Sequence, residues 1–164
     1  MNEPIKQHAL WQLLRRTTRA VGKARSIELE EVGISGQILT LLLNIVTIAD
    51  LGKDAIPSNI AKSLFLEPHS VSQQITKMEK MGLVDKISDL KRKNLVRIDL
   101  TETGQEVLQK SIDRRHSTEK IISVLTEDER HQLWITLAKL RDAAVKELRI
   151  KNPIIYPPSD PSQM

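Results

Sequence analysis

Hydrophobic side chains return at helical spacing over most of the chain. From Lys6 to Leu29 they recur at steps of three and four residues, which predicts one long amphipathic helix. From Ile38 to Ala49 they occupy nearly every side of a helix, which predicts a buried central element. Ser35 is placed to cap this second helix, and Gly52 is placed to end it.

The middle of the chain predicts two short helices followed by a hairpin. Residues 57–64 and 68–81 each begin with a proline, which suits the first turn of a helix. Short apolar runs at 83–87 and 95–100 predict two strands joined by a polar tip. Ile56 is expected to add a single strand residue beside this hairpin.

The last third predicts further helices and then a tail. Thr101 is placed to cap a helix whose apolar side allows it to continue to Leu125. Residues 126–129 form a capping box, and an apolar stripe then extends to Leu148. The four prolines after Lys151 exclude an α-helix, so the tail is expected to be a flexible extension or an arm that packs on a partner subunit.

Composition narrows the fold class. Hydrophobic residues make up 40% of the 164 residues, but only four residues are aromatic, so the core must be aliphatic. We therefore expect a mainly α fold with a small β-hairpin. The chain has no cysteine, which excludes disulfides and thiolate catalysis.

The first residues contain no apolar signal core, and the run at 38–49 is shorter than the roughly 20 residues that a bilayer requires. We therefore expect a cytoplasmic protein.

The helix predicted at 68–81 has an outer face suited to DNA. Val71, Ile75 and Met78 fall together and should face the core. Hydrogen-bonding side chains early in the helix would suit base edges, and lysines later would suit phosphates. An ordinary solvated helix face is the alternative. The outward and flanking residues are His69, Ser70, Ser72, Gln73, Thr76, Lys77 and Lys80.

The polar tip of the hairpin carries three consecutive cations. We expect Arg92 to enter a minor groove, because a guanidinium is less strongly hydrated than an ammonium, and Lys91 and Lys93 to contact phosphates. From residue 57 to 98 there are eight Lys and Arg against four Asp and Glu. This excess accounts for the net charge of +4 on the whole chain. The alternative is a charged hairpin tip that serves solubility.

Four short motifs carry a resemblance to a known family. They are IAKSL at 60–64, SVS at 70–72, MEKMGLV at 78–84 and LTETG at 100–104. This section resembles the MarR family of winged-helix transcriptional regulators, and the helix order extends the resemblance to roughly residues 6–148. Two positions depart from the family pattern. Phe65 stands where the turn between the short helices usually has a glycine, and in the wing Asp89 is kept but Arg92 stands where a second acidic residue is expected.

The resemblance implies an organisation and a function. Residues 6–34 and 104–150 would form a helical dimerisation lobe, residues 35–103 a winged helix-turn-helix lobe, and residues 151–164 a proline-rich tail. The implied function is a homodimeric transcriptional regulator, a repressor, that binds a pseudo-palindromic double-stranded DNA operator. Many members of the family release DNA when a small molecule binds between the lobes.

Two other classes of function have to be distinguished from DNA binding. A winged-helix module that binds protein and not DNA has the same fold, and fold alone does not separate the two. An enzyme is not expected, because no nucleophile–base set, paired carboxylates or Gly-rich phosphate loop is recognisable. The four histidines have no metal-ligand spacing, so we expect no metal and no cofactor.

An effector site and a cationic helix face complete the candidate features. The candidate wall residues for a small-molecule effector are Trp11, Arg15, Ile45 and His116. The first helix has no acidic residue between Glu3 and Glu28, and Arg15, Arg19 and Lys23 share one face. This face would line a DNA-facing cleft or remain a solvated surface, and the sequence leaves both possibilities open.

Overall fold

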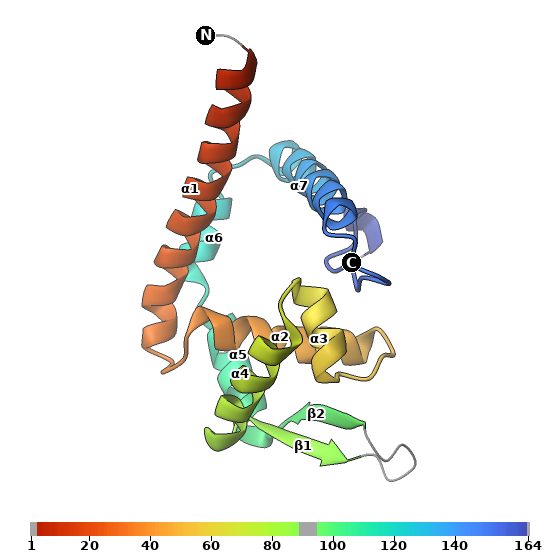
Figure 1. The fold of residues 1–164 in the computed structure, drawn as a ribbon. Coiled ribbons are helices and arrows are strands. Elements are labelled where there is room, and N and C mark those ends of the chain that lie inside the picture. Colours follow the sequence, from red (N-terminus) through yellow and green to blue (C-terminus); the bar gives the residue numbers. More distant parts are fainter. Residues whose placement is uncertain (1–2, 89–94, 164) are drawn as a thin grey trace.

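The computed structural model describes residues 3–88 and 95–163 and is mainly helical, with one β-hairpin (Figure 1). This confirms the predicted fold class. In chain order the elements are α1 (Glu3–Glu30), α2 (Gly36–Asp50), α3 (Pro57–Leu64), α4 (Pro68–Lys80), β1 (Val84–Ser88), β2 (Val96–Leu100), α5 (Glu102–Asp113), α6 (His116–Ile122), α7 (Glu127–Glu147) and the short 3-10 helix η1 (Pro161–Gln163).

Helix α2 is the centre of the main hydrophobic core. It packs against α1, α3, α5 and β2, and Leu41, Leu42 and Ile48 on it are almost completely buried. The Ser35 side chain accepts a hydrogen bond from the Ile38 N–H at 3.3 Å, as expected for an N-cap. The predicted buried central helix is therefore confirmed. The same core extends to Leu108 of α5, so α5 is packed into the winged-helix part of the chain.

Strands β1 and β2 form an antiparallel hairpin in which Val84 lies opposite Leu100. The Ile98 N–H donates to the Ala55 carbonyl oxygen at 2.9 Å, which ties β2 to the segment before α3. The prediction that Ile56 forms the strand-like contact was wrong by one residue. Ile56 instead takes the N-cap position of α3, where its carbonyl oxygen accepts from the Ile60 N–H.

The motif at 100–104 joins the hairpin to α5. Thr101 caps α5 by accepting from the Gly104 N–H at 3.0 Å, and its hydroxyl donates to the Gly82 carbonyl oxygen at 2.6 Å. Gly104 lies so close to Leu83 that an added Cβ would overlap the Leu83 carbonyl oxygen. The threonine and the glycine of this motif therefore both serve the contact between α5 and the start of β1.

The expectation that one helix continues from Thr101 to Leu125 was wrong. Helix α5 ends at Asp113, and α6 begins at His116. The intervening Arg114 has a non-helical ψ of 51°. No glycine or proline stands at this break, so the cause lies elsewhere in the fold. The capping box at 126–129 is confirmed, with Thr126 and Glu129 exchanging hydrogen bonds at the start of α7.

Helices α1, α6 and α7 form the end of the molecule away from the hairpin (Figure 1). Helix α6 packs on α1, whereas the main packing of α7 is with η1. Large apolar side chains on these helices are left exposed, among them Leu10, Trp11 and Leu13 on α1 and Leu133, Leu137 and Leu140 on α7. In the part of the chain that the structure describes, no helix is long and apolar enough to cross a membrane.

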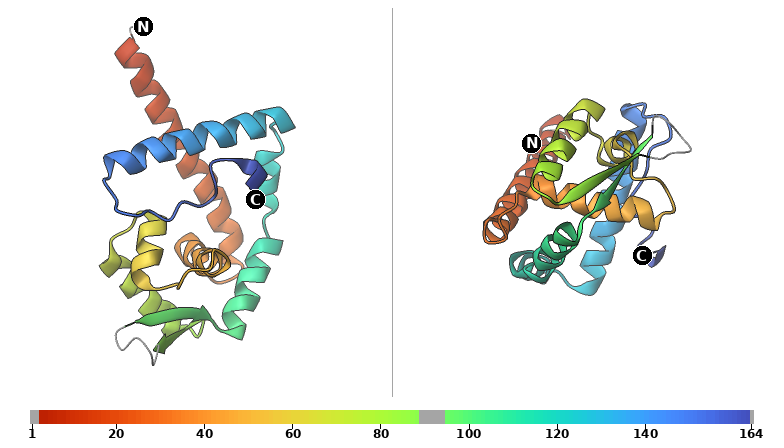
Figure 2. Two further views of the ribbon diagram at one scale, coloured as in Figure 1. Left: turned by 90° about the vertical axis from the view of Figure 1, so that its right-hand side faces the viewer. Right: turned by 90° about the horizontal axis from the view of Figure 1, so that it is seen from below.

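The C-terminal tail folds back along α7 of its own chain (Figure 2). The Trp134 indole N–H donates to the Pro158 carbonyl oxygen at 3.0 Å, and Arg141 donates to the Pro157 carbonyl oxygen and to the Ser159 hydroxyl. The tail is therefore not the flexible extension that was one of the two expectations, and its packing on a partner subunit stays a prediction. It contains no α-helix, as predicted, but it is held by hydrogen bonds within one subunit.

Candidate nucleic-acid interface

Helix α4 is fixed in place by its apolar face. Val71, Ile75 and Met78 are 1%, 0% and 0% exposed, so the predicted inward face is confirmed. The helix packs against α3 and β1, and Pro68 stands in its first turn. Because three core residues set its rotation, the opposite face of α4 must point outward.

The outward face has the predicted polar character. Ser70 and Thr76 are half-buried at the edges of this face. Thr76 lies close to Lys86 of β1. Lys77 and Lys80 form no ion pair with any residue that the structure describes, so their charges are available for a partner. The exposed residues of α4 are Pro68, His69, Ser72, Gln73, Lys77 and Lys80.

Hydrogen bonds within α4 order several of these side chains. The Gln73 amide nitrogen and the His69 ring nitrogen are 3.0 Å apart. The Ser72 hydroxyl donates to the Pro68 carbonyl oxygen at 2.9 Å, and the Thr76 hydroxyl donates to the Ser72 carbonyl oxygen at 3.0 Å. Both hydroxyl oxygens keep acceptor capacity, whereas the Gln73 amide retains an acceptor oxygen and a second N–H. Gln73 is therefore the residue best equipped to read a base edge.

Sequence reasoning missed Lys86 of β1. Its ammonium donates to the Thr76 hydroxyl at 3.1 Å and forms an ion pair with Glu79 at 2.6 Å. This ion pair offsets the acidic charge on α4 that would repel a phosphate. The sequence carries no signal for the contact, because the distance between Lys86 and α4 depends on how the hairpin packs.

The cationic tip of the hairpin lies outside the described residues, so the roles predicted for Lys91, Arg92 and Lys93 stay predictions. At the base of the hairpin, the Arg97 guanidinium binds both oxygens of Asp99, at 2.9 and 2.8 Å. Figure 1 shows the hairpin beside α4 at one end of the molecule. The base of the hairpin and α4 are therefore neighbours.

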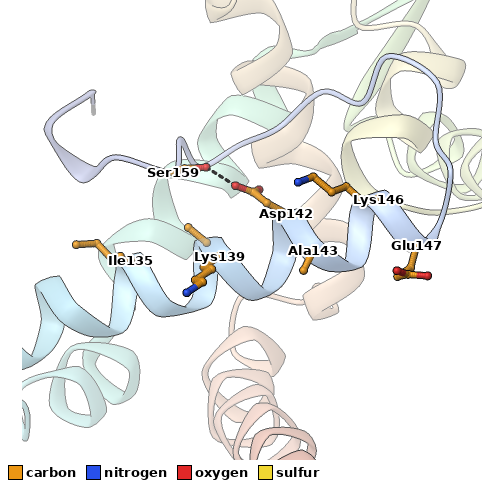
Figure 3. A pocket seen from close by; sticks show the side chains of 8 residues that line it. Ile135, Lys139, Asp142, Ala143, Lys146, Glu147 and Ser159 are labelled. Carbon is orange, nitrogen blue, oxygen red and sulfur yellow. Dashed lines mark hydrogen bonds between the residues drawn. The ribbon is translucent and has the colours of Figure 1, made fainter.

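One of the four effector candidates, Ile45, does not share an open surface with the others. Trp11, Arg15 and His116 are exposed, but Ile45 is 3% exposed inside the core around α2, so its side chain does not face open space. A groove lies between α7 and the tail, and none of the four candidates lines it (Figure 3). Its lining residues are Ile135, Ala138, Lys139, Asp142, Ala143, Lys146, Glu147 and Ser159.

The cationic face of α1 lies apart from the α4 surface. Arg15, Arg19 and Lys23 are exposed and form no ion pair with described residues. Helix α1 rises away from α4 and the hairpin toward the opposite end of the molecule (Figure 1). Among the described residues, no group of three His, Asp or Glu side chains is placed to hold a metal ion.

Comparison with solved structures identifies the architecture. No protein-family model and no curated protein matches the sequence. The structure matches the organohalide-sensing transcriptional regulator RdhR, solved with bound 2,4-dichlorophenol, with a TM-score of 0.81 and 27% identity over 96% of this chain and 94% of that one. The chain has the MarR-family winged-helix fold.

Two further proteins with the MarR fold were solved with DNA. A mutant of MarR from E. coli, complexed with operator DNA, matches with a TM-score of 0.74 and 17% identity over 85% of this chain and 99% of that one. The M. tuberculosis regulator MosR, complexed with DNA, matches with a TM-score of 0.68 and 22% identity over 85% of this chain and 97% of that one. The resemblance seen in the four sequence motifs is thus confirmed at the level of the fold.

Proposed function

We propose that this protein is a homodimeric, sequence-specific DNA-binding transcriptional regulator that acts as a repressor in the cytoplasm. Helix α4 enters the major groove of each half-site, and the hairpin tip reaches the adjacent minor groove. Two-fold symmetry then requires half-sites about 10 base pairs apart, one turn of the duplex.

The outward face of α4 carries the proposal. Its inward face is locked by Val71, Ile75 and Met78, so the exposed Gln73 and Lys77 are held at a fixed rotation. A rigid polar helix next to a hairpin, with lysines in its last turn that pair with no described residue, suits groove binding. The MarR and MosR structures solved with DNA support this assignment, and the matched proteins are regulators and not enzymes.

The homodimer rests on apolar surface that one chain does not cover. Leu10 and Leu13 of α1 are 66% and 63% exposed, and α7 carries three exposed leucines although its main packing is with the short η1. Isolated helices of this kind gain most of their stability by burying an apolar face. A second copy offers the same faces in return, as an isologous interface requires. On this proposal α1, α6 and α7 form the dimerisation lobe, whereas α5, although it lies within the predicted range 104–150, packs with the winged-helix core.

A small-molecule effector would act through the spacing of the two winged-helix lobes. Such a molecule must bind better to a spacing that does not match the DNA repeat, because only a difference in affinity between two states can shift their populations. The structure of the regulator RdhR with bound 2,4-dichlorophenol supports a small-molecule effector. Trp11, Arg15 and His116 remain the proposed positions for its contacts.

Electrophoretic mobility shift with fragments of the source genome tests the function. The proposal expects retardation of a small set of fragments, with an affinity that falls steeply between about 50 and 200 mM salt because phosphate contacts release counterions. If no fragment is retarded at low salt while the chain associates with another protein, the chain is instead a winged-helix module for protein interaction.

A further inference from the structure

The break between α5 and α6 is held by two side chains of α1. The Arg25 guanidinium donates to the carbonyl oxygens of Ser111 and Arg114, at the end of α5. The Glu28 carboxylate accepts from the Ser117 N–H at 2.6 Å, in the first turn of α6. Arg25 and Glu28 also bind each other at 2.8 Å. One ion pair therefore satisfies backbone groups on both sides of the break.

This ion pair is sheltered and well anchored. The side chains of Arg25 and Glu28 are only 17% and 15% exposed. The next residue, Leu29, is completely buried in the winged-helix core, so the end of α1 is fixed to that lobe. The hydrogen bond from Ser117, assisted by Arg25, holds the pKa of the Glu28 carboxyl below its ordinary value, so the carboxylate is charged at neutral pH.

The local sequence does not require a break here. Residues 110–119 contain neither glycine nor proline. If Arg25 and Glu28 were absent, the free carbonyl and N–H groups at the break could bond to each other in one continuous helix. A straight helix would carry α6 along the axis of α5 and would therefore place α6 and α7 differently relative to the winged-helix lobe. The break therefore determines how the winged-helix lobe is oriented relative to the helices that form the proposed dimer.

We propose that Arg25 and Glu28 are positioning residues that hold the α5–α6 break open and thereby set the distance between the two DNA-binding lobes of the dimer. The two residues touch no DNA. They act through the hinge, and this inference rests on the proposed function for its consequence, which is a preferred spacing between half-sites.

The first arm of the test measures half-site spacing. A genomic fragment bound by the wild type is compared with versions carrying one inserted base pair, which turns the second half-site by about 35°. The wild type should lose about tenfold or more in affinity. Glu28→Ala and Arg25→Lys should reduce this loss to about threefold or less, because a loosened hinge tolerates both spacings. Affinity for an isolated half-site, which a general loss of folding would lower, should be unchanged.

Conservative and control variants sharpen this arm. Glu28→Gln keeps an acceptor for the Ser117 N–H but loses the charge, so it should lie between the wild type and Glu28→Ala. A lysine at position 25 cannot bond two carbonyl oxygens and a carboxylate in the planar geometry of a guanidinium. Glu31→Gln is the matched control, because Glu31 pairs with Arg114 at the same break at 2.6 Å but is exposed. It should behave as the wild type.

The second arm needs no DNA. Because the chain has no cysteine, Lys62→Cys in α3 and Gln132→Cys in α7 give two labelling sites in each subunit. Mixing labelled subunits with an excess of cysteine-free subunits gives dimers in which one subunit carries both spin labels. Pulsed electron paramagnetic resonance should give a narrow distance distribution for the wild type and a broad or shifted one for Glu28→Ala and Arg25→Lys. Equal distributions in all variants would overturn the inference, even if DNA binding holds. If the wild type binds no DNA but the distributions differ as expected, the proposed function fails and the hinge remains.

Discussion

Gly104 in α5 lies directly against the carbonyl oxygen of Leu83, at the point where the hairpin begins. A side chain at this position would overlap backbone atoms, which cannot move aside as the end of a flexible side chain could. The Gly104 N–H also donates a hydrogen bond to the Thr101 hydroxyl, which caps α5. The close approach of α5 to β1 therefore depends on the absence of a Cβ.

Gly104→Ala should destabilise the protein by about 1–3 kcal/mol, the usual cost of overpacking. Thermal unfolding followed by circular dichroism measures the change. Gly22→Ala is the matched control, because nothing lies within 4 Å of a Cβ at Gly22 in the middle of α1. Alanine should there stabilise the helix by about 0.5–1 kcal/mol. Equal stability of the two variants would contradict the packing described.

Phe65 occupies a left-handed backbone conformation, with φ of 56°, at the end of α3. This conformation costs a residue with a Cβ about 1–2 kcal/mol. Phe65→Gly should remove the strain and raise the free energy of unfolding in urea, by about 1 kcal/mol or less because some packing is lost. Phe65→Ala keeps the strain and loses the ring, so it should be less stable than the wild type. An alanine variant as stable as the glycine variant would show that backbone strain is not the cause.

Acid should release the tail from α7. The Ser159 hydroxyl, followed by Arg141, holds the pKa of the Asp142 carboxyl below its ordinary value of 3.8. A depressed pKa in the folded state means that the contribution to stability is present above the ordinary pKa and is lost as pH falls through the folded one. In a Trp11→Phe background, Trp134 fluorescence should change below about pH 4.

Asp142→Asn controls the acid experiment, because an amide does not titrate there. Its Trp134 signal should show no transition linked to this site. A transition of the same size and midpoint in Asp142→Asn would assign the acid effect to a different group.

The exposed leucines of α7 should hold two chains together. Leu137→Glu replaces an apolar side chain, which is 43% exposed in the single chain, with a charged one. We expect the variant to sediment as a monomer or to lose its cooperative unfolding, since a charge buried at an interface without a partner is costly. Gln132→Glu, on an already polar position of the same helix, should remain a dimer. A Leu137→Glu chain that remains an intact, stable dimer would exclude this face as the interface.

Periodicity in the sequence was sufficient for the elements whose faces are set locally. The rotation of α4 follows from Val71, Ile75 and Met78. The burial of α2 follows from the apolar residues on nearly every side of the helix itself. In each case the residues that decide the structure lie within a single helix. The N-caps at Ser35, Thr101 and Thr126 are also local, and the structure has all three.

The features that the sequence did not predict are held by distant contacts. The break after Asp113 depends on Arg25 and Glu28, which are 86 to 89 residues from the groups they bind. The tail is ordered by Trp134 and Arg141, and its prolines alone would favour an extended, loose segment. Lys86 is a further case, because only the packing of the hairpin on α4 brings its ammonium to Glu79.

The role of the outward face of α4 is tested most directly by two substitutions on it. Gln73 and Lys77 are both exposed, and neither side chain is part of the core. Fluorescence anisotropy with a bound genomic fragment, and with single base-pair variants of it, should be measured at several salt concentrations for the wild type, Gln73→Ala and Lys77→Ala.

The account predicts different results for the two variants. Lys77→Ala should weaken all sequences about equally and reduce the slope of log affinity against log salt by about one unit. Gln73→Ala should leave that slope unchanged and should lose about 1–3 kcal/mol of discrimination at one base pair in each half-site. If both variants match the wild type in affinity, salt slope and sequence preference, α4 does not read DNA and the central claim is wrong.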